Sequence, residues 1–429
     1  MDSHMSAVIY ILVILFGTSS WLSTNAIWME LSLLTQSLPE GWSLPSYLAA
    51  VIQVACIGPL VYSLLHKCTD ITIPKAPTIL VLLISCSACT LLLAFGWDWT
   101  AYIFGVERSV ALIGITFLLA LVNATSNVLF MPYMATFHPN YLTAYFVGMG
   151  LSALVPSLVS LLQGTLVYEC VPDSSGSLQP KYSPARFHVE EFSLIMFGWM
   201  CLATVSFIIL HWFIPTRRRN ATSSNTLPAA EPNLEESSPL QNGILSSPTA
   251  DSPEAIKASN VRYWVLIVCL AVVCAQMNSV IPSVQSYASL SYSLLTYHLA
   301  LSLANLMHPV ACFIPLWLKP KSLNVLTSLT ALTTFFCGLI VVLALQSPTP
   351  LLRHSVWGSA ISIVAAIIAA SLNSYLRTVL TSVVREDSPQ NESRLFWCGV
   401  VMQAGSFLGA CLMFPLVNVF NIFHSANLC

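Results

Sequence analysis

Charged residues are scarce in this sequence. They make up 8% of its 429 residues, whereas a soluble domain carries about 25%. Apolar residues make up 56%, and the mean hydropathy is +0.76. This excludes a soluble globular protein, because there is too little charge to cover a water-exposed surface. We therefore predict an all-α polytopic membrane protein.

The sequence also lacks the signatures of common enzyme sites. It contains no HExxH, no GxSxG, no Walker loop and no G-x-G-x-x-G turn. Most of the 13 cysteines, such as Cys86 and Cys89, lie in apolar runs, where a free thiol packs as a small hydrophobic side chain. We therefore expect no enzyme, no metal site, no cofactor and no nucleic-acid partner.

Long apolar runs dominate what is present. A membrane-spanning helix needs about 20 mostly apolar residues, and eleven runs reach this length, six before residue 215 and five after residue 260. They lie near residues 7–34, 46–66, 77–97, 109–134, 141–166, 190–214, 262–285, 294–318, 323–346, 355–384 and 395–420. We predict a 6+5 arrangement of transmembrane helices, with a six-helix bundle over residues 1–214 and a five-helix bundle over residues 261–429.

A polar stretch at residues 215–260 separates the two sets of runs. It contains three consecutive arginines near its start and continues mainly through Asn, Ser, Thr, Pro and Glu. Such a composition buries too little apolar surface to fold. We predict a disordered cytoplasmic linker here.

Lysine and arginine set the expected orientation. Placing the N-terminus in the cytoplasm puts most of them in inside loops, which is the usual bias. Eleven spans then put the C-terminus outside. Cys170, in the largest external loop, and Cys429, at the C-terminus, would face an oxidising side. A disulfide between them and two free thiols are equal alternatives.

An aromatic and polar stripe lies in the first run. Trp21, Asn25 and Trp28 follow one another at steps of four and three residues, which places them on one helix face. Polar side chains at membrane depth usually face a cavity, and two rings around an amide suit a flat heterocycle. The alternative is an aromatic belt at the membrane interface, with Asn25 bonded to a neighbouring helix. We favour the cavity.

Polar residues occur at comparable depths in both halves. In the fourth run, Asn123 fits substrate contact and interhelical hydrogen bonding equally well. In the seventh, Pro282 interrupts the helix beside Gln285, and interrupted helices often line transport sites. The other residues that we expect at the site are Tyr297, Asn305 and Asn373. We predict a central cavity between two bundles, reached alternately from each side.

Three of the ionisable residues in or near the spans carry expectations of their own. Glu30 follows Asn25 by about one turn, and His298 opens the eighth span, so both are expected to gate the site or sense pH. The alternatives are a loop-facing carboxylate and a neutral, hydrogen-bonded imidazole. Arg377, near the inner end of the tenth span, is expected to extend to the cytoplasmic surface.

Several segments match one known family. They are Phe16-Gly-Thr-Ser-Ser-Trp21, Leu38-Pro-Glu-Gly-Trp-Ser-Leu-Pro-Ser-Tyr47, Pro282-Ser-Val-Gln-Ser-Tyr287 and Gln403-Ala-Gly-Ser-Phe-Leu-Gly-Ala410. On these segments the chain resembles the vertebrate riboflavin transporters of solute carrier family 52 along nearly its whole length. The resemblance implies sodium-independent riboflavin uptake across the plasma membrane. It also implies a major-facilitator-like fold, similar to the equilibrative nucleoside transporters.

Riboflavin has a neutral three-ring system with a polar edge and a polyhydroxylated tail. The contacts expected for it are ring stacking by Trp21 or Trp28, edge recognition by Asn25 or Gln285, and tail contacts from Asn123, Asn305 and Asn373. A transporter of another flat heterocycle, such as a nucleoside, stays open as an alternative, and so does a cell-surface receptor. The external loops could also provide an incidental docking surface for external proteins or viruses.

Overall fold

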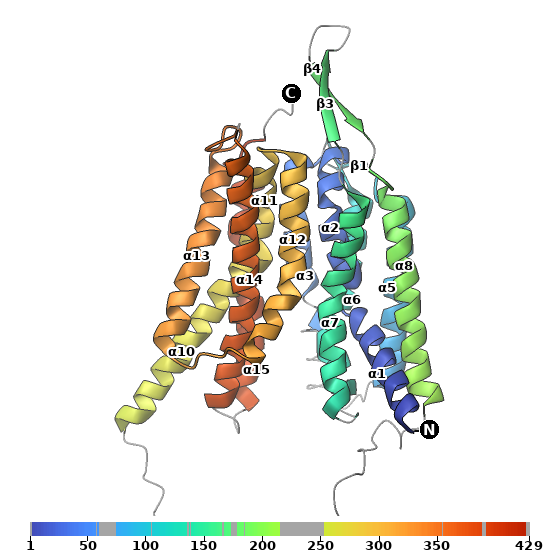
Figure 1. Cartoon of the computed structure of the whole chain (residues 1–429), viewed down its shortest axis with the longest axis vertical. Helices are drawn as coiled ribbons and strands as arrows, with labels where there is room; N and C mark the ends of the chain where they lie inside the picture. Colours follow the sequence, from blue (N-terminus) through green and yellow to red (C-terminus); the bar gives the residue numbers. More distant parts are fainter. Residues whose placement is uncertain are drawn as a thin grey trace, which may run out of the picture.

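The computed structural model describes most of the chain (Figure 1). The described residues are 2–56, 58–59, 74–103, 105–134, 137, 139–164, 167–172, 178–183, 185–214, 253–353, 355–387 and 392–425. Of the predicted linker, only residues 253–260 are among them, and these residues belong to a helix. The bundle boundaries at residues 214 and 261 stay a prediction.

The first half of the chain is a set of long helices with two small hairpins. Its helices are α1 (Asp2–Thr18), α2 (Leu22–Ser37), the short 3₁₀-helix η1 (Gly41–Ser43), α3 (Leu44–Ala55), α5 (Lys75–Gly96), α6 (Val110–Met134), α7 (Pro139–Gln163), α8 (Val189–Ile208) and the π-helix η2 (Ile209–Phe213). The antiparallel hairpins pair β1 (Ala101–Ile103) with β2 (Val106–Arg108), and β3 (Val167–Pro172) with β4 (Leu178–Ser183).

The second half repeats the helical pattern. Its helices are α10 (Pro253–Ala275), the π-helix η3 (Gln276–Val280), α11 (Ile281–Leu290), α12 (Leu294–Phe313), the 3₁₀-helix η4 (Ile314–Leu316), α13 (Leu323–Leu345), α14 (Val356–Asp387) and α15 (Glu392–Asn418). Figure 1 shows the two halves side by side, with the β3–β4 hairpin projecting from one end. We call this end the hairpin side. The opposite end, where η2 ends and α10 begins, is the linker side.

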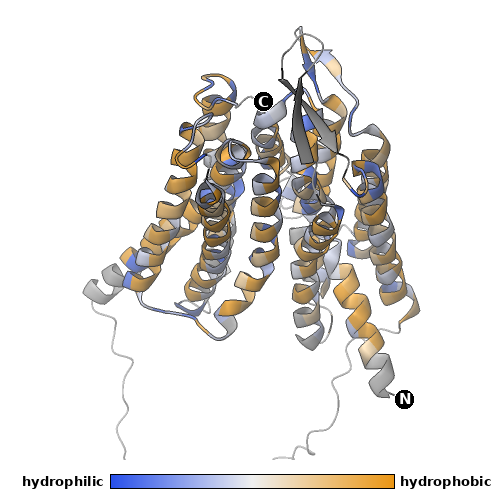
Figure 2. Cartoon of the chain, turned by 45° about the horizontal axis from the view of Figure 1, so that its top comes forward, coloured by the Kyte–Doolittle hydropathy of each residue, from blue (hydrophilic) through white to orange (hydrophobic). Residues whose placement is uncertain are grey.

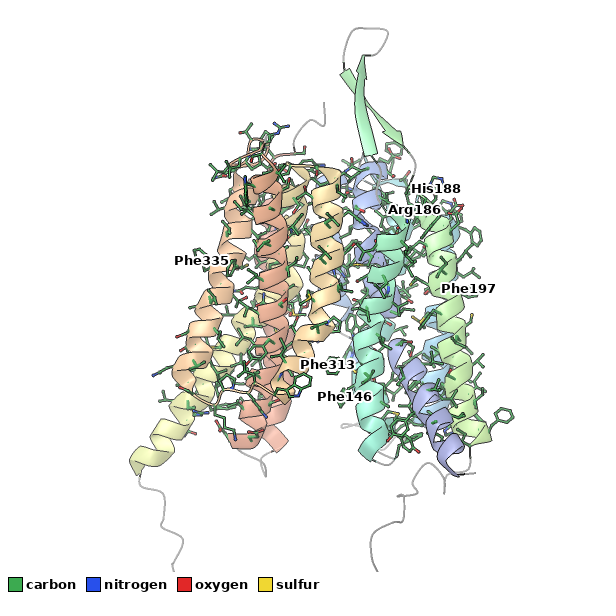
Figure 3. The ribbon with its side chains drawn as sticks, viewed as in Figure 1. Phe146, Arg186, His188, Phe197, Phe313 and Phe335 are labelled. Atoms are coloured by element: carbon green, nitrogen blue, oxygen red, sulfur yellow. The ribbon has the colours of Figure 1, made fainter. Side chains whose placement is uncertain are left out.

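The helices have the composition of membrane spans. Among the described residues, seven helices are long and apolar enough to cross a membrane, or up to eight if the bent pair α1–α2 is one span. Apolar residues cover the helices (Figure 2), and Phe197 and Phe335 point outward from α8 and α13 (Figure 3). The all-α, membrane-spanning prediction is confirmed, whereas the count of eleven stays a prediction.

Exposed tryptophans mark both ends of the spans. Trp99 and Trp357 are more than 60% exposed on the hairpin side, at 64% and 74%. Trp212 and Trp317 are 50% and 81% exposed on the linker side. Indole rings concentrate at the two membrane–water interfaces. These residues therefore indicate where the bilayer surface meets the protein.

The first apolar run is not one straight helix. The hydroxyls of Thr18, Ser19 and Ser20 donate to the backbone carbonyls three residues earlier, at 2.6–2.9 Å. Hydroxyls that bond the backbone compete with helical hydrogen bonds, and α1 ends here. The axis of α2 then departs from that of α1 by 54°. Trp21 therefore lies at the break rather than on the helical face that carries Asn25.

A buried carboxylate fixes the connection between α2 and α3. Glu40, which is 7% exposed, accepts hydrogen bonds from the Ser109 backbone N–H at 2.9 Å and the Ser109 hydroxyl at 2.6 Å. Ser109 immediately precedes α6. A carboxylate at a helix N-terminus is stabilised by the free amides and the helix dipole. Glu40 therefore joins η1 to the N-terminus of α6.

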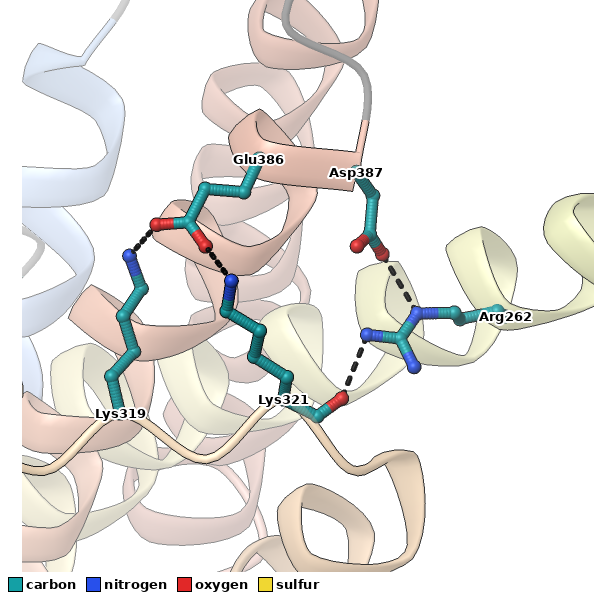
Figure 4. A network of polar contacts seen from close by, with 5 residues as sticks. All are labelled: Arg262, Lys319, Lys321, Glu386 and Asp387. Atoms are coloured by element: carbon teal, nitrogen blue, oxygen red, sulfur yellow. Dashed lines mark hydrogen bonds and ion pairs between the residues drawn. The ribbon is translucent and has the colours of Figure 1, made fainter.

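Ion pairs tie the second half together at the linker side (Figure 4). Glu386 in α14 pairs with Lys319 and, at 3.0 Å, with Lys321. Arg262 in α10 pairs with Asp387 at 2.7 Å and donates to the Lys321 carbonyl at 2.8 Å. The network links α10, α14 and the segment between α12 and α13.

Glu386→Gln should remove a pH-dependent part of the stability. The hydrogen bonds from Lys319 and Lys321 lower the pKa of Glu386 from 4.5. A carboxylate with a lowered folded-state pKa stabilises the fold above its unfolded pKa, and this contribution is lost as the pH falls through the lowered pKa. Thermal unfolding in detergent should therefore show a difference between wild type and variant at pH 6 that narrows below pH 4.5. The idea fails if the two proteins differ equally at every pH.

Candidate functional site

The two halves meet along a seam formed by a few helices. On the first half, α2, α3 and α7 contribute to it; on the second, α11, α12 and α15 do. Three hydrogen bonds between described residues cross it. Ser286 Oγ donates to the Trp42 carbonyl at 2.6 Å, Asn418 Nδ2 donates to Ser46 Oγ at 2.7 Å, and Ser32 Oγ lies 3.3 Å from His298 Nδ1.

Aromatic rings close the seam at the hairpin side. Trp42 meets Tyr287 edge-on with ring centroids 5.9 Å apart, and Tyr47 meets Phe414 at 5.2 Å. These residues lie in η1, the start of α3 and the hairpin-side ends of α11 and α15. The seam is therefore closed at the hairpin side in this structure.

Farther toward the linker side, α7 and α12 approach without polar contacts between their described side chains. A Cβ built on Gly150 of α7 would lie 3.3 Å from Pro309 and 3.8 Å from Phe313. Figure 3 shows Phe146 and Phe313 on the edges by which the two halves face each other. When helices packed by apolar contacts of this kind separate, no hydrogen bond or ion pair has to be broken.

The first span of each half departs from a regular α-helix. In the first half it breaks before Trp21; in the second, residues 260–290 form one continuous helix that contains the π-helix η3 just before Pro282. Around η3, Asn278 Nδ2 donates to Ser406 Oγ at 2.9 Å, and Gln276 Nε2 donates to Thr334 Oγ1 at 2.7 Å. The prediction that Pro282 interrupts the helix is wrong, because the span continues through Pro282 and only the π-helix before it departs from α-helical geometry.

The stripe expected in the first run is only partly formed. Asn25 Nδ2 donates to the Ser152 carbonyl at 3.2 Å, so it links α2 to α7, as the interhelical alternative holds. Trp28 is half-buried and packs against Ile52, Ala55 and Ala120. Trp21 is also half-buried. Ring stacking by either tryptophan stays a prediction.

Asn123 lies inside the first half. It is 1% exposed, donates through Nδ2 to Thr24 Oγ1 at 2.6 Å, and accepts from the Cys86 thiol. Buried polar groups in spans are usually satisfied by neighbouring helices, and here α2 and α5 supply the partners. In this conformation Asn123 is not at the seam. Cys86 and Cys89 have a C-x-x-C spacing, but both are free thiols on α5.

The expected residues of the second half differ in how their hydrogen bonds are satisfied. Gln285 is buried, with Nε2 donating to Ser289 at 2.7 Å and Oε1 without a partner. Tyr297 and Asn373 are fully buried, and the phenol and both amide atoms have no partner. Asn305 is half-buried and donates to the Leu301 carbonyl at 2.9 Å. Buried groups without partners are uncommon in folded proteins, so the Gln285 oxygen, the Tyr297 hydroxyl and the Asn373 amide keep hydrogen-bonding capacity that the described residues do not use.

Glu30 and His298 do not come together. Glu30 is 3% exposed and lies in a small pocket between α2, α5 and α8, whereas His298 contacts Ser32 across the seam. Gln163 Nε2 donates to Glu30 Oε2 at 3.3 Å, and Oε1 has no partner. The alternative of a loop-facing carboxylate is therefore wrong for Glu30, because its side chain turns into the first half. Gating or pH sensing by Glu30 stays a prediction.

Some residues of the seam were missed from sequence. Ser46, Trp42 and Tyr287 lie in the segments that carry the family resemblance, but no pattern in them showed that they meet. Arg377, expected to extend to the cytoplasmic surface, lies in α14 and is half-buried, so that expectation stays a prediction. Within the described part of the chain, no group of three or more His, Cys, Asp or Glu is placed to hold a metal ion. Cys170 and Cys429, for which a disulfide and two free thiols were equal alternatives, lie outside the residues whose side chains are described.

The fold is that of major-facilitator transporters. A peptide transporter of the POT family matches with a TM-score of 0.57 at 13% identity, covering 96% of this chain and 90% of that one. A bacterial homolog of the human lysosomal transporter Spinster, in an inward-facing, unoccupied conformation, matches with a TM-score of 0.55 at 14% identity, covering 96% and 82%. At such identities the likeness shows the fold alone, and it confirms the major-facilitator-like prediction.

Sequence relatives extend over the whole chain. Riboflavin transporters rft-1 and rft-2 of Caenorhabditis elegans are 45% and 43% identical, covering 98% and 99% of this chain and 98% of each relative. Riboflavin transporter member 3 of Homo sapiens is 35% identical over 99% of both chains. The model of solute carrier family 52, riboflavin transporter, matches residues 5–425. The chain therefore belongs to the solute carrier family 52 of riboflavin transporters.

Proposed function

We propose that this chain carries riboflavin across the plasma membrane, independently of sodium, by alternating access to a site at the seam. The observation that carries the proposal is the family match over residues 5–425 together with a two-half fold whose seam is closed at one end only by a few contacts. The proposed path runs between the halves, past the break before Trp21 and the π-helix η3.

The chemistry of the residues expected at the site supports a neutral, flat substrate. Trp21 and Trp28 offer partly exposed rings, and Gln285, Tyr297 and Asn373 retain polar atoms without partners. Each hydrogen bond that a substrate forms with such atoms contributes about 0.5–1.5 kcal/mol. These residues would therefore serve transport, rather than catalysis or receptor signalling. Docking of external proteins or viruses stays a separate prediction.

Positive charge supports an orientation with the linker side in the cytoplasm. Arg262, Lys319 and Lys321 all lie at the linker side, where the inside-positive bias places them. In the proposed orientation the closed hairpin side is the external side.

Uptake of labelled riboflavin by cells expressing the chain tests the proposal. We expect saturable uptake that persists when sodium is replaced by choline, and that unlabelled riboflavin but not uridine blocks. Block by uridine would instead favour a nucleoside carrier. Background uptake by protein shown to be at the cell surface would overturn the proposal.

Glu30→Gln should abolish any pH dependence of this uptake. The pocket around Glu30 is lined by Ala26, Ile27, Leu34, Thr90, Leu93, Val189, Phe192, Ser193 and Met196, so none of its other lining residues is titratable. An ionised carboxylate buried without a cation is strongly unfavourable. We infer that Glu30 holds a proton in this state and releases it in another.

The measurement compares uptake at pH 6 and pH 7.4. We expect wild type to differ between the two and Glu30→Gln, which keeps the shape and the partner Gln163, to be equal at both. Because Glu191 lies on α8 as an exposed carboxylate, Glu191→Gln serves as the control. An unchanged rate and pH profile in Glu30→Gln would remove Glu30 from the coupling mechanism.

A further inference from the structure

The chain turns back on itself after α15. Two backbone N–H groups just after the helix donate to the Pro415 carbonyl at 2.9 Å, and that of Ile422 donates to the Leu416 carbonyl at 3.1 Å. Asn421 has a φ of +46°, in the left-handed region that asparagine adopts more readily than most residues. We call residues 419–425 the C-terminal turn. Its path is set by these backbone contacts with α15.

The C-terminal turn buries a single aromatic ring. Phe423 is 6% exposed, whereas the other apolar side chains of residues 419–425 are exposed. The ring of Phe423 packs on that of Tyr287 in α11, with centroids 5.6 Å apart and planes tilted by 36°. Tyr287 also meets Trp42 of the first half at 5.9 Å. The three rings therefore form a row from the C-terminal turn, through α11, to the opposite half.

Hydrogen bonds anchor the C-terminal turn beside Phe423. Ser347, in the segment between α13 and α14, donates through Oγ to the His424 carbonyl. Ser291, just after α11, donates to Ser347 Oγ at 3.1 Å, and both serines are buried. The residue that follows Phe423 is thus held by two other segments of the second half. The Phe423 ring consequently has a fixed position against Tyr287.

The contact between Trp42 and Tyr287, which we call the ring gate, belongs to the closed end of the seam. Ser286, next to Tyr287, donates to the Trp42 carbonyl at 2.6 Å, so α11 meets Trp42 through two adjacent residues. A side chain has only a few staggered rotamers, and Phe423 fills the space beside one part of the Tyr287 ring. Without Phe423, the Tyr287 ring could turn into the vacated space and lose its contact with Trp42.

We propose that Phe423 is a positioning residue for transport: it holds the Tyr287 ring against Trp42 and thereby stabilises the state in which the hairpin side is closed. The inference rests on the proposed alternating access, in which this end opens and closes in each cycle. Loss of the Phe423 ring changes the balance between the two states, because it weakens a contact made only in the closed one.

Thiol labelling of the full-length protein in nanodiscs tests the proposal. The reporter is Ser46→Cys, because Ser46 is buried and bonded to Asn418 across the seam at 2.7 Å. A maleimide reaches this position when the hairpin side opens. Labelling is read at residue 46 by peptide mass spectrometry, so the native thiols do not interfere. We expect Phe423→Ala to raise the labelling rate about threefold or more, which corresponds to the loss of one aromatic pair.

Phe420→Ala is the matched control. It removes a ring of the same size from the same C-terminal turn, but this ring is 68% exposed. Labelling at residue 46 should therefore stay at the rate of the parent protein. Unchanged labelling in folded Phe423→Ala, or an equal increase in both variants, would overturn the proposal.

A second reporter separates opening of the ring gate from general loosening. Ser193 is buried inside the first half, in the pocket that contains Glu30. Partial unfolding would expose both reporters, whereas opening at the hairpin side exposes residue 46 alone. We expect Phe423→Ala to leave the labelling of Ser193→Cys unchanged. An equal increase at both positions would mean that Phe423 only stabilises the fold, and the proposed role would be wrong.

Ser347→Ala covers the case in which Phe423→Ala does not fold. This change removes the hydrogen bond to the His424 carbonyl and leaves all three rings in place. It should raise labelling at residue 46 about twofold or more, and an unchanged rate in this variant would overturn the proposal. If labelling responds as expected but cells expressing the wild type take up no riboflavin, the proposed function fails while the role of Phe423 stands.

Discussion

Alanine at Gly148 should leave little folded protein. A Cβ at this position would lie 2.2 Å from the Ile14 carbonyl oxygen and 2.8 Å from the Gly17 Cα. Both atoms belong to the backbone of α1, so no side-chain rotation relieves the collision, and α1 and α7 must move apart. Small residues permit such close approach of spans, and overpacking of this kind costs about 3 kcal/mol or more. Fluorescence-detected size-exclusion chromatography and thermal unfolding in detergent measure the loss.

Gly198→Ala is the matched control. Gly198 lies on α8, and a Cβ there would meet nothing within 4 Å. The same Gly→Ala change should therefore leave yield and thermal stability at or slightly above wild type, since alanine favours helices. Equal behaviour of the two variants would show that the α1–α7 contact is not as close as the structure has it.

Cross-linking the seam at the hairpin side should stop transport almost completely. The side chains of Ser46 and Asn418 are joined by a 2.7 Å hydrogen bond, and they belong to α3 and α15, in different halves. Alternating access requires these halves to separate at this end. In the double variant Ser46→Cys/Asn418→Cys, oxidation should therefore reduce riboflavin uptake to background, and a reductant should restore it.

The single variants control for the native thiols. Ser46→Cys and Asn418→Cys each leave one new thiol without its partner, so oxidation should change their uptake little. Full uptake by a double variant whose cross-link is shown on a gel would mean that the hairpin side does not open during transport.

The sequence predicted the class of the fold better than the internal form of its spans. Scarce charge and long apolar runs are properties of composition, and they alone predict that the helices span a membrane. The prediction of the major-facilitator-like fold came from the segments that resemble the family. The break at Thr18–Ser20 was not predicted, because it depends on which hydroxyls bond their own backbone. Helix α10 likewise begins at Pro253, inside the stretch expected to be unstructured.

The direction of a polar side chain was the hardest property to predict. Asn25, Asn123 and Glu30 lie in helical runs as expected, yet all three turn toward partners within the first half. A period of 3.6 residues shows which residues share a face, but not which neighbour that face meets. Asn373, in contrast to these three residues, has no hydrogen-bond partner for its amide among the described residues, and the sequence did not show this.

The Glu40–Ser109 contact has a consequence for how the closed end would open. It fastens η1, which carries Trp42, to the N-terminus of α6 through two hydrogen bonds, while Trp42 meets the second half through a single carbonyl and one ring contact. When the halves part, the weaker attachment yields first. Trp42 would then move as a fixed part of the first half, and its indole would lose its contact with Tyr287 as the halves separate.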